Sequence, residues 1–390
     1  MLIPKLAFRN LWGAGLRTWL NVVVLSLAFV TIIWTQGIYE GMNEQTAQAM
    51  LDTEYGGGQY WHDKYDPFDP LALQDAHAKI PTLISDLIHE NQATPILITQ
   101  GAIYPNGRIR SVLLKGIDPA QTILTIPSHF LDVKDEELPA LIGSRMAESS
   151  NLKVGDYVTV RWRDANGTFD AQDAQIVQVM KTTVQSIDNA QLWIPLQKLQ
   201  QMIGMEDEAT LVVVDKKVKA PPATTGWSFK NLDYLLRDIR ELVRTKSVGA
   251  SIMYLLLLFM AMLAIFNTQI LSIFRRRKEM GTLMALGMTR AKVIQLFTLE
   301  GALHGAWAAI VAAIYGIPLV TYFAAKGMGL PQSTDSYGFA IGERIFPVYS
   351  AGLVIGTTLL VLIITTIVSY LPTRKISKLK PTDALRGKLS

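Results

Sequence analysis

The chain has 390 residues, of which 49% are apolar and only 18% are charged, and its mean hydropathy is +0.23. This composition is too apolar for an ordinary soluble protein, so part of the chain must lie in lipid. The sequence has no cysteine, which excludes disulfides and thiolate sites, and its five histidines are scattered without the spacing of a metal site.

Four apolar stretches approach or exceed the length of about 20 residues that a helix needs to cross a bilayer. Helices are expected because lipid offers no partner for backbone polar groups. The first stretch is longer than the apolar region of a usual signal peptide and has no small-residue cleavage site close behind it, so we expect it to be retained. The predicted spans are residues 19–38, 248–274, 297–325 and 346–371.

The segments outside these spans fall into two groups by charge. Residues 1–18, 275–296 and 372–390 together carry 15 Lys and Arg against two acidic residues, whereas residues 39–247 carry 20 Lys and Arg against 28 Asp and Glu. Because short basic loops stay in the cytoplasm, we expect both termini on that side, and residues 39–247 and 326–345 on the other. The total net charge of +4 hides this asymmetry and is no signal for nucleic acid.

Residues 39–247 are predicted to form an extracytoplasmic α+β domain on two helical stalks, residues 40–51 and 227–247. Turn residues predict hairpins around "PNG" and around the later "NG". Helices are expected over residues 70–91 and in "PALIGSRMAESSNL", a strand running into a helix in "AQLWIPLQKLQQMIG", and a strand in "ATLVVV". The domain has no Gly-rich phosphate loop, no Ser/His/Asp spacing and no carboxylate pair typical of catalysis.

The segment "RRRKEMGTLMALGMTRAKVIQL", residues 275–296, separates the second and third spans. Its apolar positions predict a short amphipathic helix along the membrane surface, and Gly287 allows the chain to reverse. Such a helix could dock in a groove on a cytoplasmic partner, with an outward face predicted to comprise Glu279, Met284, Leu286 and Met288.

Charged residues mark where this segment meets the membrane. Four adjacent cations are expected to anchor the chain at the interface. Glu300 follows within the third span, where an unpaired carboxylate costs about 2.5 to 3.5 kcal/mol on insertion scales. It is expected either to form an ionic latch with a partner or with the loop cations, or to reach the interface as a solvated side chain. The four cations are Arg275, Arg276, Arg277 and Lys278.

The stretch from Phe274 to Gly301 resembles the coupling-helix signature of FtsX-like permeases, the membrane subunits of MacB-type ABC transporters. The segment "KLAFRNLWGAGLRTWLN" resembles the family's cytoplasmic amphipathic helix, placed here at residues 1–18, and "PTDALRGK" resembles its closing pattern. The resemblance implies an α-helical membrane protein with four transmembrane helices and an α+β extracytoplasmic domain inserted between helices 1 and 2. It also implies ATPase-coupling roles for Glu279, Gly281, Leu283, Met284, Leu286, Gly287, Met288 and Arg290.

Two blocks of the outer domain, "SVLLKGIDPAQ" and "PALIGSRMAESSNLKVGDYVTV", resemble lipoprotein-releasing permeases of the LolC and LolE kind. That resemblance implies that acyl chains enter a cavity between the first two spans of facing protomers. Alternative interpretations are an efflux permease for a drug or peptide, an FtsX-like regulator of a cell-wall hydrolase, and an extracytoplasmic enzyme. The implied cavity residues, which could equally be lipid-facing or helix-packing side chains, are Val24, Leu27, Val30, Ile33, Leu256, Phe259 and Met262.

The sequence contains no GxxxxGK[ST] motif, so this chain is not expected to cradle ATP or any other cofactor. ATP and Mg are instead expected in a separate cytoplasmic ABC ATPase dimer. The other expected partners are a second permease copy or a paralogue, a lipoprotein or other amphipathic substrate, a periplasmic carrier and the lipid of a bacterial inner membrane.

Overall fold

The computed structural model describes residues 2–13, 15–133, 137–182, 184–218, 221–329 and 344–376. The chain divides into two compact units. The helical unit comprises Met1–Met42, Leu242–Gly329 and Ile345–Ser390, and the strand-rich unit comprises Asn43–Glu241 and Leu330–Arg344. The closing sequence pattern at residues 381–386 and most of the predicted 326–345 loop lie outside the described residues.

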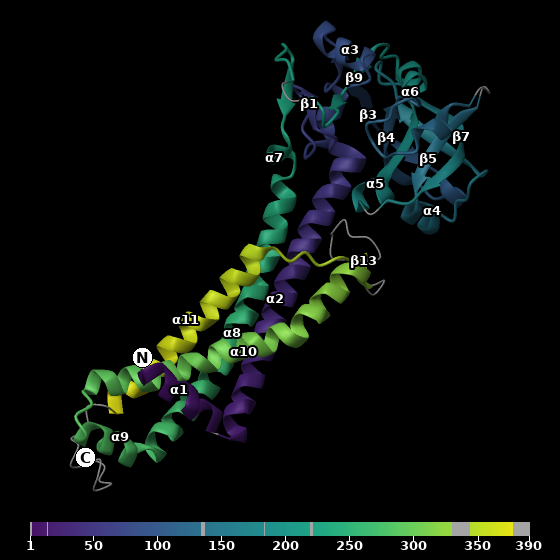
Figure 1. Cartoon of the computed structure of the whole chain (residues 1–390). Coiled ribbons are helices and arrows are strands. Elements are labelled where there is room, and N and C mark those ends of the chain that lie inside the picture. Colours follow the sequence, from purple (N-terminus) through teal and green to yellow (C-terminus); the bar gives the residue numbers. More distant parts are fainter. Residues whose placement is uncertain are drawn as a thin grey trace. The chain divides into compact units, whose positions relative to one another are not determined.

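Long helices build the helical unit (Figure 1). Four of those described, α2, α8, α10 and α11, are long and apolar enough to cross a membrane, in agreement with the four predicted spans. Helix α11 begins at Ala351, five residues after the predicted start at residue 346. The Ser350 hydroxyl caps its first turn by accepting a hydrogen bond from the Leu353 amide. The helices that contribute are α1 (Leu2–Gly13), α2 (Leu16–Met50), α8 (Arg237–Arg275), α9 (Arg277–Ala285), α10 (Arg290–Lys326) and α11 (Ala351–Ile376).

Small residues let these helices approach one another closely. A Cβ atom on Gly305 of α10 would lie 2.7 Å from the Thr365 hydroxyl of α11, and one on Gly316 would lie 2.7 Å from a methyl group of Val30 on α2. An apolar cluster joins all four long helices around these contacts, formed by Val22, Leu25, Phe29, Val30, Leu258, Ala308, Ala312 and Val361.

The strand-rich unit contains a nine-stranded sheet in the order β11-β1-β10-β3-β4-β8-β5-β7-β6 among its described residues. Because β6 also pairs with β3, the strands β3, β4, β8, β5, β7 and β6 close into a ring. The strands are β1 (Gly58–His62), β3 (Ala93–Ile103), β4 (Arg110–Ile117), β5 (Leu138–Gly143), β6 (Tyr157–Arg163), β7 (Phe169–Met180), β8 (Gln191–Pro195), β10 (Leu211–Val214) and β11 (Trp227–Lys230).

Alternating side chains fill the ring. On β6, Val158, Val160 and Trp162 are buried while the residues between them are exposed, which is the pattern of a strand with one face on a core. Shorter elements complete the two units.

They are the π-helix η1 (Leu51–Tyr55), η2 (Pro70–Gln74), β2 (Ala78–Lys79), α3 (Thr82–His89), η3 (Pro105–Gly107), η4 (Ser128–Leu131), α4 (Ser144–Ser150), α5 (Gln185–Ala190), α6 (Leu196–Ile203), β9 (Glu208–Ala209), α7 (Leu232–Leu235), β12 (Met328–Gly329) and β13 (Arg344–Ile345).

Both predicted hairpins are confirmed. Strands β3 and β4 pair in antiparallel fashion on either side of Pro105–Gly107, and β6 pairs with β7 around a turn in which Gly167 has φ +84°. The predicted strand-to-helix passage is also found, as β8 followed by α6, and "ATLVVV" contains β10.

Three helix predictions in this unit need correction. The first half of "PALIGSRMAESSNL" is β5, all six residues of which are buried, because its continuous apolar run suits an inner strand between β7 and β8. The expected helix over residues 70–91 is found as two separate pieces, the 3₁₀ helix η2 at Pro70–Gln74 and α3 at Thr82–His89. The expected stalk helix at 227–247 begins as a strand, Trp227–Lys230, which pairs with β1.

Gly305→Leu is expected to destabilise the helical unit by about 1 to 3 kcal/mol, because the larger side chain must displace Thr365 from a packed helix interface. Thermal unfolding in detergent measures this loss. Gly356→Leu is the matched control, since a Cβ there meets nothing within 4 Å. Equal losses in both variants would show that the α10–α11 contact is not tightly packed.

Candidate coupling site

The elbow, residues 276–289 between α8 and α10, contains the predicted short helix as α9. The chain reverses after α9 at Gly287, whose φ of +94° is in the left-handed region that glycine adopts readily. The amides of Gly287 and Met288 donate to the carbonyls of Met284 and Leu283, which closes the end of the helix. The elbow is therefore an ordered helix and turn.

Arg276 is the polar centre of the elbow. Its Nη1 donates to both carboxylate oxygens of Glu300 at 3.0 and 2.9 Å, and its Nε donates to Glu279 at 2.7 Å. The guanidinium also lies 5.0 Å from the ring centre of Phe297. These contacts join the start of α9 to the first turns of α10, so one side chain fixes the angle between the two helices.

The two carboxylates differ in their exposure. The Glu300 side chain is 6% exposed and that of Glu279 is 62% exposed, while the Arg276 side chain between them is 22% exposed. Burial lowers the pKa of the Arg276 guanidinium, but Glu300 and Glu279 together raise it more, so the net shift is upward and the group stays charged. Glu300 thus forms the ionic latch with a loop cation that the sequence predicted as one alternative.

An apolar cluster attaches the elbow to α1 and α10. Met280 of α9 packs with Val293 and Leu296 of α10 and with Ala7 of α1, all of them buried. Aromatic contacts tie α1 to α10 as well, since the Phe8 and Trp307 ring centres are 6.0 Å apart. This role of α1 is not predicted from the sequence, although the apolar residues spaced along "LIPKLAFRNLWG" indicate a buried face.

The outward face of the elbow is narrower than the sequence predicted. Leu286 is 80% exposed at the end of α9, and Glu279 is exposed in its first turn. The prediction that Met284 and Met288 point outward is wrong, because both pack against the apolar cluster and are only partly exposed. Leu283 packs there too, Gly281 is buried, and Arg290 is exposed at the start of α10.

The remaining predicted interface cations border the same segment. Arg275 is exposed at the end of α8 and Lys278 is exposed on α9, while the side chain of Arg277 lies outside the described part of the chain. Among the described residues, no group of three or more His, Asp or Glu side chains could hold a metal ion.

The residues predicted to face acyl chains separate into three groups by exposure. The expectation that Val30 faces acyl chains needs correction, because its side chain is 8% exposed and packs against Gly316 of α10. Ile33 and Met262 are half-buried. The four that present exposed apolar side chains are Val24 and Leu27 on α2 and Leu256 and Phe259 on α8.

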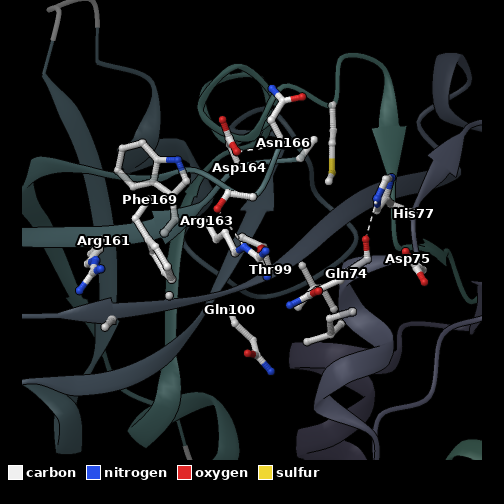
Figure 2. Close-up of a pocket in the computed structure, with 18 of the residues that line it drawn as sticks. Gln74, Asp75, His77, Thr99, Gln100, Arg161, Arg163, Asp164, Asn166 and Phe169 are labelled. Atoms are coloured by element: carbon white, nitrogen blue, oxygen red, sulfur yellow. Dashed lines mark hydrogen bonds between the residues drawn. The ribbon is translucent and has the colours of Figure 1, made fainter.

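The strand-rich unit holds an open cavity of about 740 Å³ beside the β6–β7 hairpin (Figure 2). Its cations are engaged within the hairpin region: the Arg161 guanidinium lies 4.3 Å from the Phe169 ring centre and Arg163 Nε donates to the Gly167 carbonyl at 3.1 Å. At the tip, the Asp164 carboxylate accepts hydrogen bonds from the backbone amides of Asn166 and Thr168. The turn at the tip is thus held by its own hydrogen bonds.

Residues 251–381 match the family described as FtsX-like permease C-terminal. The chain is 21% identical over 328 residues to the lipoprotein-releasing system transmembrane protein LolC of Neisseria meningitidis, covering 75% of this chain and 77% of that one. It is 21% identical to the macrolide export ATP-binding/permease protein MacB of Psychrobacter cryohalolentis, covering 98% of this chain but only 59% of that protein. A solved extracellular domain of the ABC-type transporter YknZ from Gram-positive bacteria aligns at 15% identity and a TM-score of 0.27, over 42% of this chain and 84% of that one.

Residues 251–381 are therefore an FtsX-like permease domain, and the chain is similar at low identity to LolC and MacB permeases. The resemblance that the elbow sequence carries is confirmed, and the matched range contains α9, the elbow turn and Glu300.

Glu300→Gln is expected to lower the free energy of unfolding by about 1 to 3 kcal/mol, because it leaves the mostly buried Arg276 cation without its buried counter-charge. Glu279→Gln, which alters an exposed partner of the same guanidinium, should change it by no more than about 0.5 kcal/mol. Unfolding in detergent at two salt concentrations measures both. Equal effects would contradict the central position of the Arg276–Glu300 pair.

Proposed function

We propose that this chain is the membrane subunit of an ABC transporter and that the elbow is its docking element for a cytoplasmic ATPase dimer. One observation carries the proposal: Leu286 is 80% exposed directly after α9, a helix that is fixed by a buried ion pair and an apolar cluster. An exposed leucine on a rigid support is suited to insert into an apolar pocket of a partner. The elbow also lies inside the FtsX-like permease domain.

In this proposal the elbow faces the cytoplasm with both termini, and the strand-rich unit faces the periplasm. The supporting evidence is the distribution of charge, since short basic segments remain in the cytoplasm. The ATPase cycle pushes the elbow, and the movement reaches the strand-rich unit through α2 and α8, which are single helices of 35 and 39 residues. The Arg276–Glu300 pair makes α9 and α10 move as one body.

The substrate is proposed to be a lipoprotein in the outer leaflet of a bacterial inner membrane. The similarity to LolC supports this choice. Exposed apolar side chains on α2 and α8, among them Leu27 and Phe259, offer a surface on which acyl chains can lie between two permease copies. A periplasmic carrier would then receive the lipoprotein.

A second candidate function is efflux of a drug or peptide. The similarity to MacB extends over 98% of this chain at the same 21% identity as the similarity to LolC, so it supports export as well. The two candidates share the elbow and its ATPase and differ in cargo. Mass spectrometry of molecules that co-purify with the chain and its ATPase separates them: a lipidated protein supports release, and a small molecule or peptide supports efflux.

Leu286→Glu is expected to weaken ATPase binding at least about tenfold and to abolish substrate-dependent ATP hydrolysis, because a carboxylate would enter an apolar pocket. Binding is measured on the full chain in nanodiscs titrated with the co-purified ATPase. Leu83→Glu, a 52% exposed leucine on α3 of the strand-rich unit, is the matched control and should bind normally. Normal binding and coupling by Leu286→Glu would refute the docking role.

A further inference from the structure

Two glycines one helical turn apart open a groove on α2. Gly37 and Gly41 lie four residues apart in "GIYEG", so they share one face of the helix, and both are buried. This spacing of small residues is typical of membrane helices that pack closely against another helix. The pattern alone therefore predicts a second helix in the groove, from this chain or from another copy of it.

The structure fills the groove with a different segment, the strap, which comprises residues 346–350 between β13 and α11 (Figure 1). The strap has neither helix nor strand. A Cβ atom on Gly41 would lie 3.0 Å from Cα of Pro347 and closer still to the preceding carbonyl oxygen, so a larger residue there must displace the strap backbone. A Cβ atom on Gly37 would lie 2.5 Å from Cδ1 in the Tyr349 ring. The strap therefore occupies the space that the two glycines leave.

One backbone hydrogen bond fixes the strap in this position. The Val348 amide donates to the Gly37 carbonyl at 2.9 Å. In an α-helix the carbonyl of residue 37 points along the axis toward residue 41, where a Cβ atom would restrict access to it. Gly41 thus lets the strap backbone reach the helix, and Gly37 accepts the hydrogen bond and makes room for the Tyr349 ring.

The strap leads directly into α11. Its last residue, Ser350, caps the first turn of that helix. Farther along α11, the Thr357 hydroxyl donates to the side-chain oxygen of Gln36 at 3.3 Å. The start of α11 is thus attached to α2 at two neighbouring residues, directly at Gln36 and through the strap at Gly37.

A continuous set of contacts connects the elbow to the strap. The Arg276–Glu300 pair fixes α10 to the elbow, and α10 packs closely on α11 where Gly305 meets Thr365. The strap then connects α11 to α2 at Gly41, the last residue but one of α2 in the helical unit. Helix α2 continues beyond this point as a single helix. The strap therefore holds α2 where this helix leaves the helical unit.

We propose that the strap is a clamp that passes movement of α10 and α11 to α2, with Tyr349 as the residue that positions it. This proposal rests on the proposed coupling function and names the place where motion reaches the helix that leads into the strand-rich unit. A loose loop could not do this, whereas a segment bonded to α2 and capping α11 moves with both helices. The groove of Gly37 and Gly41 is then closed to a second permease copy.

Crosslinking tests the position of the strap without any ATPase. The cysteine-free full chain would receive the pair Glu40→Cys and Phe346→Cys, both at exposed positions, and would be treated in nanodiscs with a short bismaleimide. We expect a linked peptide pair within one chain, and Gly41→Leu should lower its yield at least about fivefold because the larger side chain displaces the strap. Gly356→Leu, with open space around it, is the control. Absence of the intrachain pair, a linked dimer in its place, or an unchanged yield in Gly41→Leu would overturn the proposal.

Hydrogen–deuterium exchange of the full complex with the co-purified ATPase tests the transfer of motion. In the parent chain, ATP with vanadate should change the exchange of the elbow and of η1, the π-helix that follows α2. Gly37→Leu displaces the Tyr349 ring, so the change should persist at the elbow and fall at least about twofold in η1. A change at the elbow without one in η1 of the parent chain would refute the clamp alone. No change at either place would refute the docking role, and the clamp with it.

A compensating pair of substitutions separates the clamp from general damage to the fold. Tyr349→Ala removes the ring that Gly37→Leu displaces, so the double variant refills the same space. We expect it to recover at least about half of the exchange change in η1, which each single variant reduces. Gly356→Leu should respond as the parent chain does. No recovery in the double variant, or a full response in Gly37→Leu alone, would contradict the role of Tyr349.

Discussion

The ion pair between Arg276 and Glu300, in which one guanidinium nitrogen donates to both carboxylate oxygens, is the interaction on which the proposed mechanism depends. A carboxylate that is 6% exposed is unfavourable without a counter-charge, and Arg276 supplies that charge from the other side of the elbow. The pair forces the start of α9 against the first turns of α10, and Phe297 packs under the guanidinium. A buried pair of this kind specifies one geometry even where its net contribution to stability is modest. It gives the elbow the stiffness that a docking element needs.

The apolar cluster beneath the elbow explains why so little of α9 is left for a partner. Met280, Leu283 and Met284 attach the helix to α1 and α10, so the large apolar side chain left exposed there is Leu286, beside Ala285. The helix cannot be removed from its support without exposing this cluster. Force applied at Leu286 would therefore act on α10 and α1 together, which is a requirement of the proposed coupling.

The sequence predicted those features that follow from local chemistry. The apolar spans, the "PNG" and "NG" turns and the reversal at Gly287 follow from hydropathy and backbone freedom, and the structure contains them. Prediction from the sequence fails where tertiary contacts decide the local structure or the exposure of a side chain. Strand β5 is missed because a short apolar run fits a buried strand and a buried helix equally well until its pairing with β7 and β8 is known, and Met284 is predicted to point outward because periodicity alone does not show the packing of α1.

Placement of the elbow and the strand-rich unit on opposite sides of the membrane is the central claim, and the cysteine-free sequence allows a direct measurement. Single-cysteine variants Leu286→Cys, at the exposed end of α9, and Asn166→Cys, at the hairpin tip, would each be treated with a membrane-impermeant maleimide in spheroplasts before and after permeabilisation. The account predicts that Asn166→Cys reacts in intact spheroplasts and that Leu286→Cys reacts only after permeabilisation. Labelling of both positions from the same side would contradict it.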